Sequence, residues 1–272
     1  MAFPAVRLSI PSPSLFKLPP RNAPQSLWPP LVDSTLLVPP FSIPPSFYYY
    51  VLQAKVPITI VCLYIATVVA LNTYNASTGN KPWSISKSRS FFYFVIAHNV
   101  FLAVYSAWTF IGVFNLLARV LQNPLGPTGV VGLVDSLCKI HGTSGLGNAT
   151  AYNPELSRWV SVPPSTEGLT SIHSPSTTDV GRLWNEGLGF YGWIFYLSKF
   201  YEMIDTAIIL AQGKKGSTLQ IWHHAGVLMC MWVNIRFMCS PFWIGMLMNT
   251  GIHALMVWQA RPPIILSSVN SF

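Results

Sequence analysis

The sequence predicts an all-α fold, a polytopic bundle of membrane-spanning helices. Of its 272 residues, 51% are hydrophobic and only 9% are charged, whereas soluble domains carry about 25% charged residues. Mean hydropathy is positive. Five apolar segments are also long enough to cross a hydrocarbon core, which takes roughly 20 residues. Together these observations exclude an ordinary soluble domain.

The predicted spans begin after a proline-rich segment and continue nearly to the C-terminal end of the chain. We place the five spans at residues 56–74, 91–118, 188–211, 218–238 and 240–258. The second is long enough to tilt or to extend beyond the bilayer. Residues 56–258 therefore make up one transmembrane domain.

Three segments outside the spans have a distinct composition. Residues 1–55 are rich in proline and serine and include four Pro-Pro pairs, so we expect them to be extended or disordered rather than helical. The loop at 119–187 holds glycine, proline and serine throughout, and we expect part of it to be disordered. The tail at 259–272 contains Pro262-Pro263, which breaks any helix.

Two short loops, 75–90 and 212–217, carry lysine and arginine without acidic residues. Their cations are Lys81, Lys87, Arg89, Lys214 and Lys215. The positive-inside rule places both loops in the cytoplasm and the loop at 119–187 in the lumen. A glycan is then expected at the Asn148 sequon, which is lumenal, and not at the Asn75 sequon, which is cytoplasmic.

The net charge of +8 does not indicate a nucleic-acid-binding protein, because the basic residues are scattered and no run exceeds Lys214-Lys215. In a membrane protein the excess serves orientation and the attraction of a polyanionic substrate. The four cysteines form no CxxC pair and three lie in predicted spans, so no disulfide framework is indicated.

Polar clusters interrupt the last three apolar segments. They are Lys199, Glu202, Asp205 and Thr206 in KFYEMIDT, Gln220, His223 and His224 in QIWHH, and Asn249 and His253 in NTGIHALM. With about 100° of rotation per residue, each cluster forms one polar stripe on its helix. Ionisable groups in lipid cost several kcal/mol unless they face a cavity or a partner. We therefore expect the three stripes to face one shared interior.

Clustered histidines of this kind fit two chemistries. Neutral imidazoles can bind zinc or iron, but membrane di-iron oxygenases use more clustered histidines than the six in this chain, two of which lie in the long loop. Alternatively, one imidazole attacks a thioester to give an acyl-imidazole and another moves protons. A purely structural role stays open for the His98-Asn99 pair and for the Lys199–Glu202 pair.

Read together, these motifs resemble those of the very-long-chain fatty acid elongases, the ELO family, and in particular its fungal members. KFYEMIDT matches the KxxExxDT signature, and NTGIHALMV resembles NxxxHxxMY with Val257 in place of tyrosine. QIWHH stands where the family has its HxxHH box, and His98-Asn99 resembles an HN pair in the second span. The resemblance is specific over 188–257 and weaker over 56–118.

The resemblance implies a multi-pass enzyme of the endoplasmic reticulum membrane, a 3-ketoacyl-CoA synthase. Such an acyltransferase condenses a long-chain acyl-CoA with malonyl-CoA and releases carbon dioxide and CoA. The family fold has seven transmembrane helices around a narrow acyl tunnel, and five of them are found here. No metal or other cofactor is implied. The expected partners are acyl-CoA, malonyl-CoA, membrane lipid, other enzymes of the elongation cycle and a second copy of the chain.

The resemblance also assigns roles to the histidines. His223 is the expected nucleophile, which forms the acyl-imidazole as CoA leaves. His224 and His253 then handle protons or contact the intermediate, and Asp205 orients an imidazole.

The remaining polar residues divide into oxyanion donors and substrate contacts. Asn249 or Gln220 would donate hydrogen bonds to a developing negative oxygen, worth a few kcal/mol per donor. Cationic side chains would attract the CoA phosphates. The full set of expected substrate-binding residues is Lys199, Glu202, Thr206, Lys214, Lys215, His98 and Asn99.

Two departures from the family pattern leave alternatives open. Gln220 replaces the first histidine of the box and cannot titrate. After Val257 the chain continues as WQARPPIILSSVNSF rather than through two further spans, which suggests a truncated or alternatively spliced product. The first alternative is therefore an inactive, truncated paralogue that serves as a membrane component. The second is a metal-dependent membrane oxidoreductase.

Overall fold

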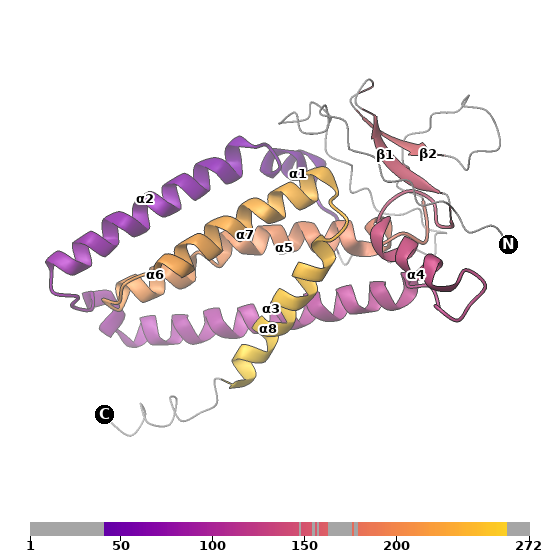
Figure 1. The fold of residues 1–272 in the computed structure, drawn as a ribbon. Coiled ribbons are helices and arrows are strands. Elements are labelled where there is room, and N and C mark those ends of the chain that lie inside the picture. The colour runs from indigo at the N-terminus through magenta and orange to yellow at the C-terminus, as the bar shows by residue number, and fades with distance from the viewer. Residues whose placement is uncertain are drawn as a thin grey trace.

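The computed structural model describes residues 41–146, 148–153, 156, 158–162, 176 and 179–259. Most of the proline-rich segment and the tail with Pro262-Pro263 lie outside these residues. The described chain confirms the all-α class: it is a bundle of helices, with one short β-hairpin at one end (Figure 1).

Helices cover each of the five predicted spans. In chain order the elements are α1 (Pro45–Val51), α2 (Lys55–Ser77), η2 (Ser84–Lys87), α3 (Arg89–Val120), α4 (Gly129–Cys138), β1 (Ala149–Asn153), β2 (Arg158–Val162), η3 (Trp184–Leu188), α5 (Gly189–Tyr201), α6 (Ile204–Ala211), α7 (Thr218–Phe237) and α8 (Phe242–Gln259). Strands β1 and β2 pair antiparallel, with Ala149 opposite Val162.

Helices α2 and α3 carry the clearest membrane signal. Of the described helices, these two are long and apolar enough to cross a bilayer by length and composition. Large apolar side chains on them point outward, such as Leu63 at 59% exposed and Val104 at 65%. Apolar surface of this extent is unfavourable in water and suits contact with lipid. The fold is therefore a membrane helix bundle.

Serine side chains begin two of the long helices. Ser88 accepts a hydrogen bond from the Phe91 amide at the start of α3, and Ser217 accepts one from the Gln220 amide at the start of α7, both at 3.1 Å. Each serine satisfies one of the amides that a helix leaves unpaired at its N-terminus. The loops that precede α3 and α7 thus fix where these spans begin.

The structure corrects one expectation about the proline-rich segment. Residues 45–51, which we expected to be extended, form helix α1 with proline in its first turn. Proline is tolerated there because its missing N–H would have no helical partner anyway. Tyr48 and Val51 of α1 are buried in the main hydrophobic core, so packing favours this short helix.

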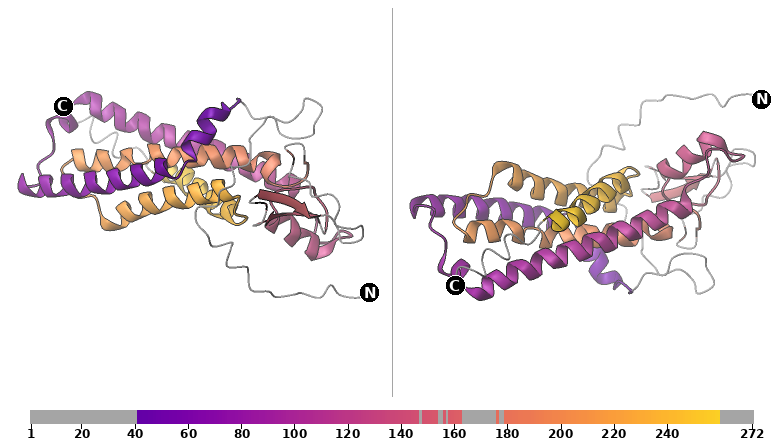
Figure 2. Two further views of the ribbon diagram at one scale, coloured as in Figure 1. Left: turned by 90° about the horizontal axis from the view of Figure 1, so that it is seen from above. Right: turned by 90° about the horizontal axis from the view of Figure 1, so that it is seen from below.

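Helices α5 and α6 lie at the centre of the bundle. Helix α7 packs on α5 and α2, α8 packs on α3 and α5, and α2 also contacts α6. In Figure 1, α8 crosses α3, and both views of Figure 2 show α5 between α2 and α3, with α7 on the outer side of α2. The core between them is closed by apolar side chains such as Leu116, Tyr196, Leu228 and Met246, each 0% exposed.

The span predicted at 188–211 is not one continuous helix. Helix α5 ends at Tyr201 and α6 begins at Ile204. Between them, the Asp205 amide donates to the Glu202 carbonyl at 3.1 Å, an i to i+3 bond that tightens the turn in the manner of a 3₁₀-helix. The break falls inside KFYEMIDT, and Glu202 and Met203 within it keep right-handed helical backbone angles.

The two basic loops lie together at one end of the bundle. The Trp83 amide donates to the Ala211 carbonyl at 2.9 Å, and the Gly216 amide donates to Asn72 Oδ1 at 2.9 Å. Gly213 has a φ of 75°, and a side chain there would collide with the Asn80 carbonyl. The shared end agrees with the prediction that both loops face one side of the membrane.

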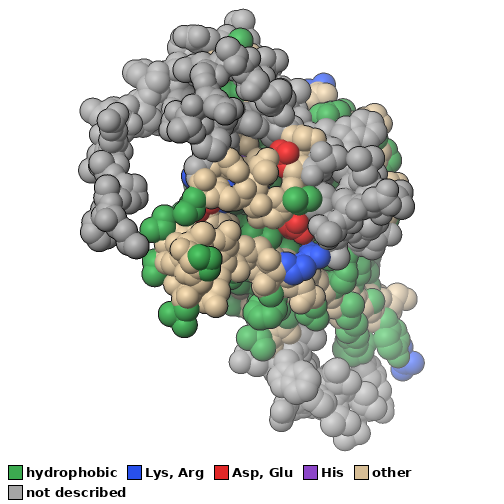
Figure 3. All heavy atoms as spheres, turned by 90° about the vertical axis from the view of Figure 1, so that its right-hand side faces the viewer, with side chains coloured by type: hydrophobic (Ala, Val, Ile, Leu, Met, Phe, Trp, Pro, Cys, Tyr) green, Lys and Arg blue, Asp and Glu red, His purple; other side chains and the backbone are tan. Residues whose placement is uncertain are grey.

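The opposite end carries α4 and the β-hairpin, so part of the loop at 119–187 is folded. Arg182, only 2% exposed, binds Asp135 Oδ2 at 2.6 Å and donates to the Gly145 and Asn148 carbonyls. Burial alone would raise the pKa of Asp135, but hydrogen bonds from Lys139 and Arg182 hold it below its usual value. Figure 3 looks onto this end and shows few charged side chains among the described atoms.

Candidate functional site

The polar residues of KFYEMIDT contact three different helices. Lys199 reaches α8, Asp205 reaches α3 and Thr206 reaches α2. The sequence predicted that these side chains form one stripe facing one shared interior. In the structure these side chains instead point to different neighbouring helices. Each one has its own partner, because helices α8, α3 and α2 all pack around this central segment.

Lys199 takes part in a buried ion pair. Its Nζ donates to Glu202 Oε1 at 2.6 Å and to Asn249 Oδ1 at 2.9 Å, and the Ser198 hydroxyl also donates to Glu202 Oε1, at 3.1 Å. The Lys199 side chain is 2% exposed and that of Glu202 6%. A buried charge is tolerated only when it is paired and hydrogen-bonded, and here both conditions are met.

Asp205 binds the imidazole of His98. The distance from His98 Nε2 to Asp205 Oδ1 is 2.7 Å, and His98 Nδ1 lies 3.0 Å from the Tyr201 hydroxyl. We expected Asp205 to orient an imidazole, and it contacts one, but that imidazole belongs to α3 rather than to QIWHH. Both ring nitrogens of His98 are occupied, so this histidine has no free nitrogen for a substrate.

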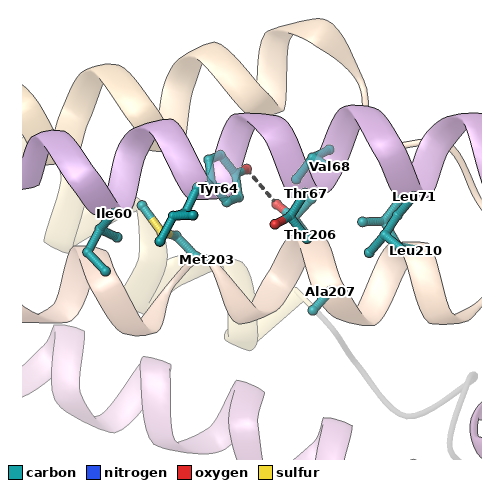
Figure 4. Close-up of a pocket in the computed structure, with 10 residues that line it drawn as sticks. Ile60, Tyr64, Thr67, Val68, Leu71, Met203, Thr206, Ala207 and Leu210 are labelled. Atoms are coloured by element: carbon teal, nitrogen blue, oxygen red, sulfur yellow. Dashed lines mark hydrogen bonds between the residues drawn. The ribbon is translucent and has the colours of Figure 1, made fainter.

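Thr206 lies beside an apolar groove between α2 and α6. Its hydroxyl is 2.9 Å from the Tyr64 hydroxyl, and the two residues share the groove wall with Met203 and Leu210 (Figure 4). The groove has a volume of about 260 Å³. Its lining is apolar apart from the paired hydroxyls and Thr67, so it suits a hydrocarbon chain.

The histidines of QIWHH have different surroundings. His224 is 8% exposed, and its ring lies 6.3 Å from the Tyr64 ring and 5.7 Å from the His223 ring. His223 is exposed. His253 on α8 is partly buried and lies within electrostatic range of Glu202 and His223. The second and third polar clusters therefore approach the first, although His223 is open on one side.

The other predicted residues fall into two groups. Lys214 and Lys215 are exposed in the loop before α7, where a soluble anion can reach them, and Gln220 is partly buried in the first turn of α7. Asn99, in contrast, is exposed on α3. It follows His98 by one residue and so points about 100° away from it. The structure does not bring Asn99 to the site.

Two tyrosines of the site were not predicted. Tyr201 lies within KFYEMIDT, four residues before Asp205, and that spacing places both on one helix face. The spacing could have indicated it. Tyr64 offered a weaker signal, because it is one of several hydroxyl side chains in a largely apolar span, and its pairing with Thr206 depends on how α2 packs on α6.

The described residues do not supply a set of metal ligands. Among them, no three His, Cys, Asp or Glu side chains come together in a group that could hold a metal ion. His98 is bound to Asp205 and Tyr201. His223 and His224 lie beside each other, but among the described residues no carboxylate joins them in a group of three.

Comparisons with known proteins agree with these motifs. Residues 49–258 match the family described as "ELO: GNS1/SUR4 family". Fatty acid elongase A of Dictyostelium discoideum is 38% identical over 64 residues, which is 24% of each chain. Fatty acid elongase 2 of Trypanosoma brucei brucei is 33% identical over 78 residues, 29% of each chain. Fatty acid elongase sre1 of Dictyostelium discoideum is 36% identical over 73 residues, 26% of this chain and 27% of its own.

The family match and the individual matches differ in extent. The family match covers the whole transmembrane domain at 56–258, whereas the chain aligns with only about a quarter of the length of the curated relatives it matches. No solved structure matches the chain.

Proposed function

Since this chain belongs to the ELO family, we propose that it catalyses the condensing step of fatty acid elongation. In this reaction a long-chain acyl group leaves CoA, and the carbanion released by decarboxylation of malonyl-CoA attacks it, so that a 3-ketoacyl-CoA is formed. The proposal places the protein in the endoplasmic reticulum membrane as a multi-pass enzyme, together with the other enzymes of the elongation cycle and, in an oligomer, with a second copy of itself.

One observation carries this proposal. Lys199, Glu202 and Thr206 of KFYEMIDT are buried and Asp205 is partly buried, and hydrogen bonds join the motif to three other helices. The His224 ring lies 6.3 Å from the ring of Tyr64, which bonds Thr206, and His253 lies one helical turn after Asn249, which bonds Lys199. Fixed charges near titratable imidazoles are what acyl transfer requires, because charge develops on both the nucleophile and the acyl oxygen.

His223 is the proposed nucleophile. Its ring is exposed, so a thioester can approach it, whereas the His224 ring beside it is buried. Attack of the imidazole on the thioester carbonyl forms an N-acyl bond and breaks the carbon–sulfur bond to CoA. His224 and His253 are then the proposed groups that exchange protons, because an imidazole nitrogen can accept a proton and release it again.

Asn249 is the proposed oxyanion donor. Its Oδ1 accepts from Lys199 Nζ at 2.9 Å, and an ammonium group can only donate. The contact therefore fixes which end of the amide faces Lys199 and leaves the Nδ2 hydrogens free for another acceptor. Gln220, which is partly buried on α7, is a second candidate for this role.

The proposed CoA contacts are the exposed Lys214 and Lys215 at the basic end of the bundle. Lys199 was also expected to attract CoA phosphates, but its charge is already paired with Glu202 in the interior. Lys199 and Glu202 are better assigned to holding Asn249. Thr206, on the wall of the apolar groove with Tyr64, remains a proposed contact for the hydrocarbon chain.

Expression in an elongase-deficient host with lipid profiling tests the proposal. We expect the unmodified chain to lengthen acyl chains and His223→Ala to abolish this activity. Trp222→Ala is the matched control, because Trp222 is an exposed ring on the same turn of α7 and has no proposed role in the chemistry. A labelled acyl group should also remain on the unmodified protein and be released by hydroxylamine.

The first alternative function is a membrane component without catalytic activity. Identical lipid profiles for the unmodified chain and His223→Ala, with both proteins present in the membrane, would establish this alternative. Stoichiometric iron in the purified protein would instead favour the oxidoreductase.

A further inference from the structure

The His98 imidazole is enclosed between three parts of the bundle. Its side chain is 0% exposed. One ring nitrogen contacts Asp205 at the start of α6, and the other contacts Tyr201 at the end of α5. The Phe94 ring stacks on it with centroids 6.1 Å apart. No other residue in the site has both polar atoms held and its whole ring buried in this way.

The carboxylate of Asp205 sets the direction of one hydrogen bond, and the neutral form of the His98 ring sets the direction of the other. An ionised carboxylate only accepts, so the proton shared with Asp205 is on His98 Nε2. A neutral imidazole then has a lone pair on Nδ1, which accepts a hydrogen bond from the Tyr201 hydroxyl. The result is a directed chain in which Tyr201 donates to His98 and His98 donates to Asp205.

These hydrogen bonds fix a carboxylate in the same polar region as His224 and His253. The Asp205 side chain is 28% exposed, so His98 does not enclose it fully. Its neighbour Thr206 is bonded to Tyr64, whose ring lies 6.3 Å from the His224 ring. Lys199 of the same motif is bonded to Asn249, which lies one helical turn before His253. Without the bond from His98, the Asp205 carboxylate would be free to rotate, and its charge would no longer have a fixed position.

We propose that His98 and Tyr201 are positioning residues, which hold the Asp205 carboxylate where its charge stabilises the imidazolium forms of His224 and His253 during acyl transfer. This inference rests on the proposed function. It replaces the expectation that His98 binds substrate, and it gives Tyr201 a role that the sequence did not indicate. Positioning groups of this kind contribute through transition-state electrostatics rather than through substrate affinity.

The kinetics of four single variants and one double variant test the inference in the detergent-purified protein. His98→Leu removes both hydrogen bonds, and Asp205→Asn removes the charge. We expect kcat to fall about tenfold to a hundredfold in each, a range seen when groups that orient a reactive residue are lost, with KM within about twofold of the unmodified value. The double variant should lose no more than the stronger single variant, because both act through one carboxylate.

Two conservative variants separate positioning from packing. In His98→Gln a side-chain amide can still donate to Asp205, so we expect kcat to recover most of the loss seen in His98→Leu. Tyr201→Phe keeps the ring, which packs 5.0 Å from the His98 ring, and removes only the hydroxyl. It should lower kcat less than His98→Leu and leave the thermal unfolding midpoint unchanged.

Other results would overturn the inference. A normal kcat in His98→Leu overturns it. So does a double variant whose loss of kcat equals the combined losses of His98→Leu and Asp205→Asn. A kcat in His98→Gln as low as that of His98→Leu overturns it as well. A raised KM with normal kcat would return His98 to substrate binding. The proposed function has its own test, because a condensing enzyme loses activity in His223→Ala whatever the outcome for His98.

Discussion

Lys199 on α5 joins Asn249 on α8 through a hydrogen bond of 2.9 Å, and the same ammonium group is paired with Glu202 at 2.6 Å. Neither α5 nor α8 could bury one of these groups alone without a large desolvation cost. Residues 50 positions apart in the chain therefore depend on each other, and the contact orders the central helix against the last helix of the bundle.

Removing one member of this buried pair should be more damaging than removing both. Lys199→Met leaves the Glu202 charge buried and unpaired, and we expect it to lower the free energy of unfolding by about 3–5 kcal/mol. The double variant Lys199→Met, Glu202→Leu should be substantially more stable than that single variant. Thermal unfolding in detergent measures both. Equal losses in the two variants would show that the pair itself, rather than an uncompensated charge, provides the stability.

Asn75 should be essential to the basic end of the bundle. It is 0% exposed, its Nδ2 donates to the Leu210 carbonyl at 2.9 Å and its Oδ1 accepts from Trp83 Nε1 at 2.8 Å. Asn75→Ala leaves these partners unsatisfied, at a cost of about 1–3 kcal/mol. Thr73→Ala, which removes an exposed hydroxyl from the same helix, is the control and should stay within about 0.5 kcal/mol. The same burial leaves no room for a glycan on Asn75.

Stability should depend on pH through His141 at the opposite end. Burial, with a smaller contribution from the nearby Arg182 charge, lowers the pKa of His141 from 6.5 to about 4. Below pH 6.5 the His141 side chain of the unfolded protein binds a proton, whereas that of the folded protein stays neutral down to about pH 4. The free energy of unfolding therefore falls as the pH drops from 6.5 to about 4. The full loss is about 3 kcal/mol.

His141→Gln should flatten the profile between pH 7 and pH 5, as measured by thermal unfolding. The Asp135 carboxyl does not obscure the result, because its pKa is held below its usual value of 3.8 and its contribution is lost only at more acidic pH. An unchanged profile in His141→Gln would show that another group titrates in this window.

The exposed lysines before α7 should affect substrate affinity rather than turnover. Replacing both Lys214 and Lys215 with alanine removes two charges that can attract CoA phosphates, and we expect KM to rise roughly two- to fivefold, since exposed charge pairs contribute up to about 1 kcal/mol. The effect should diminish at high salt. Lys55→Ala is the control, because Lys55 is exposed at the other end of α2. A KM that is unchanged, or equally changed by the control, contradicts the assignment.

The sequence located the helices well because their limits depend on local chemistry. The segment predicted at 218–238 forms a helix at Thr218–Phe237, where Ser217 caps the helix and a basic loop precedes it. The family was predicted from the resemblance of the three polar motifs to those of known elongases, and the match over residues 49–258 confirms it.

Tertiary packing decided the features that the sequence did not indicate. Helical periodicity placed Asp205 and Thr206 on one stripe, but it could not show that Asp205 binds His98, 107 residues away, while Thr206 binds Tyr64, 142 residues away. The break after Tyr201 was also missed, since no proline or glycine marks it. Asn99 was included because it follows His98, although the helix turns it outward.

The short segment that joins α5 to α6 has a consequence for how the protein unfolds. Within eight residues, from Lys199 to Thr206, the chain is attached to α8, α3 and α2 in turn. A fluctuation that displaces this segment must release all three neighbours together, which makes partial melting of the bundle costly. Loss of tertiary order should therefore be cooperative, and amide hydrogens on α5 and α6 should exchange with solvent only when the whole bundle opens.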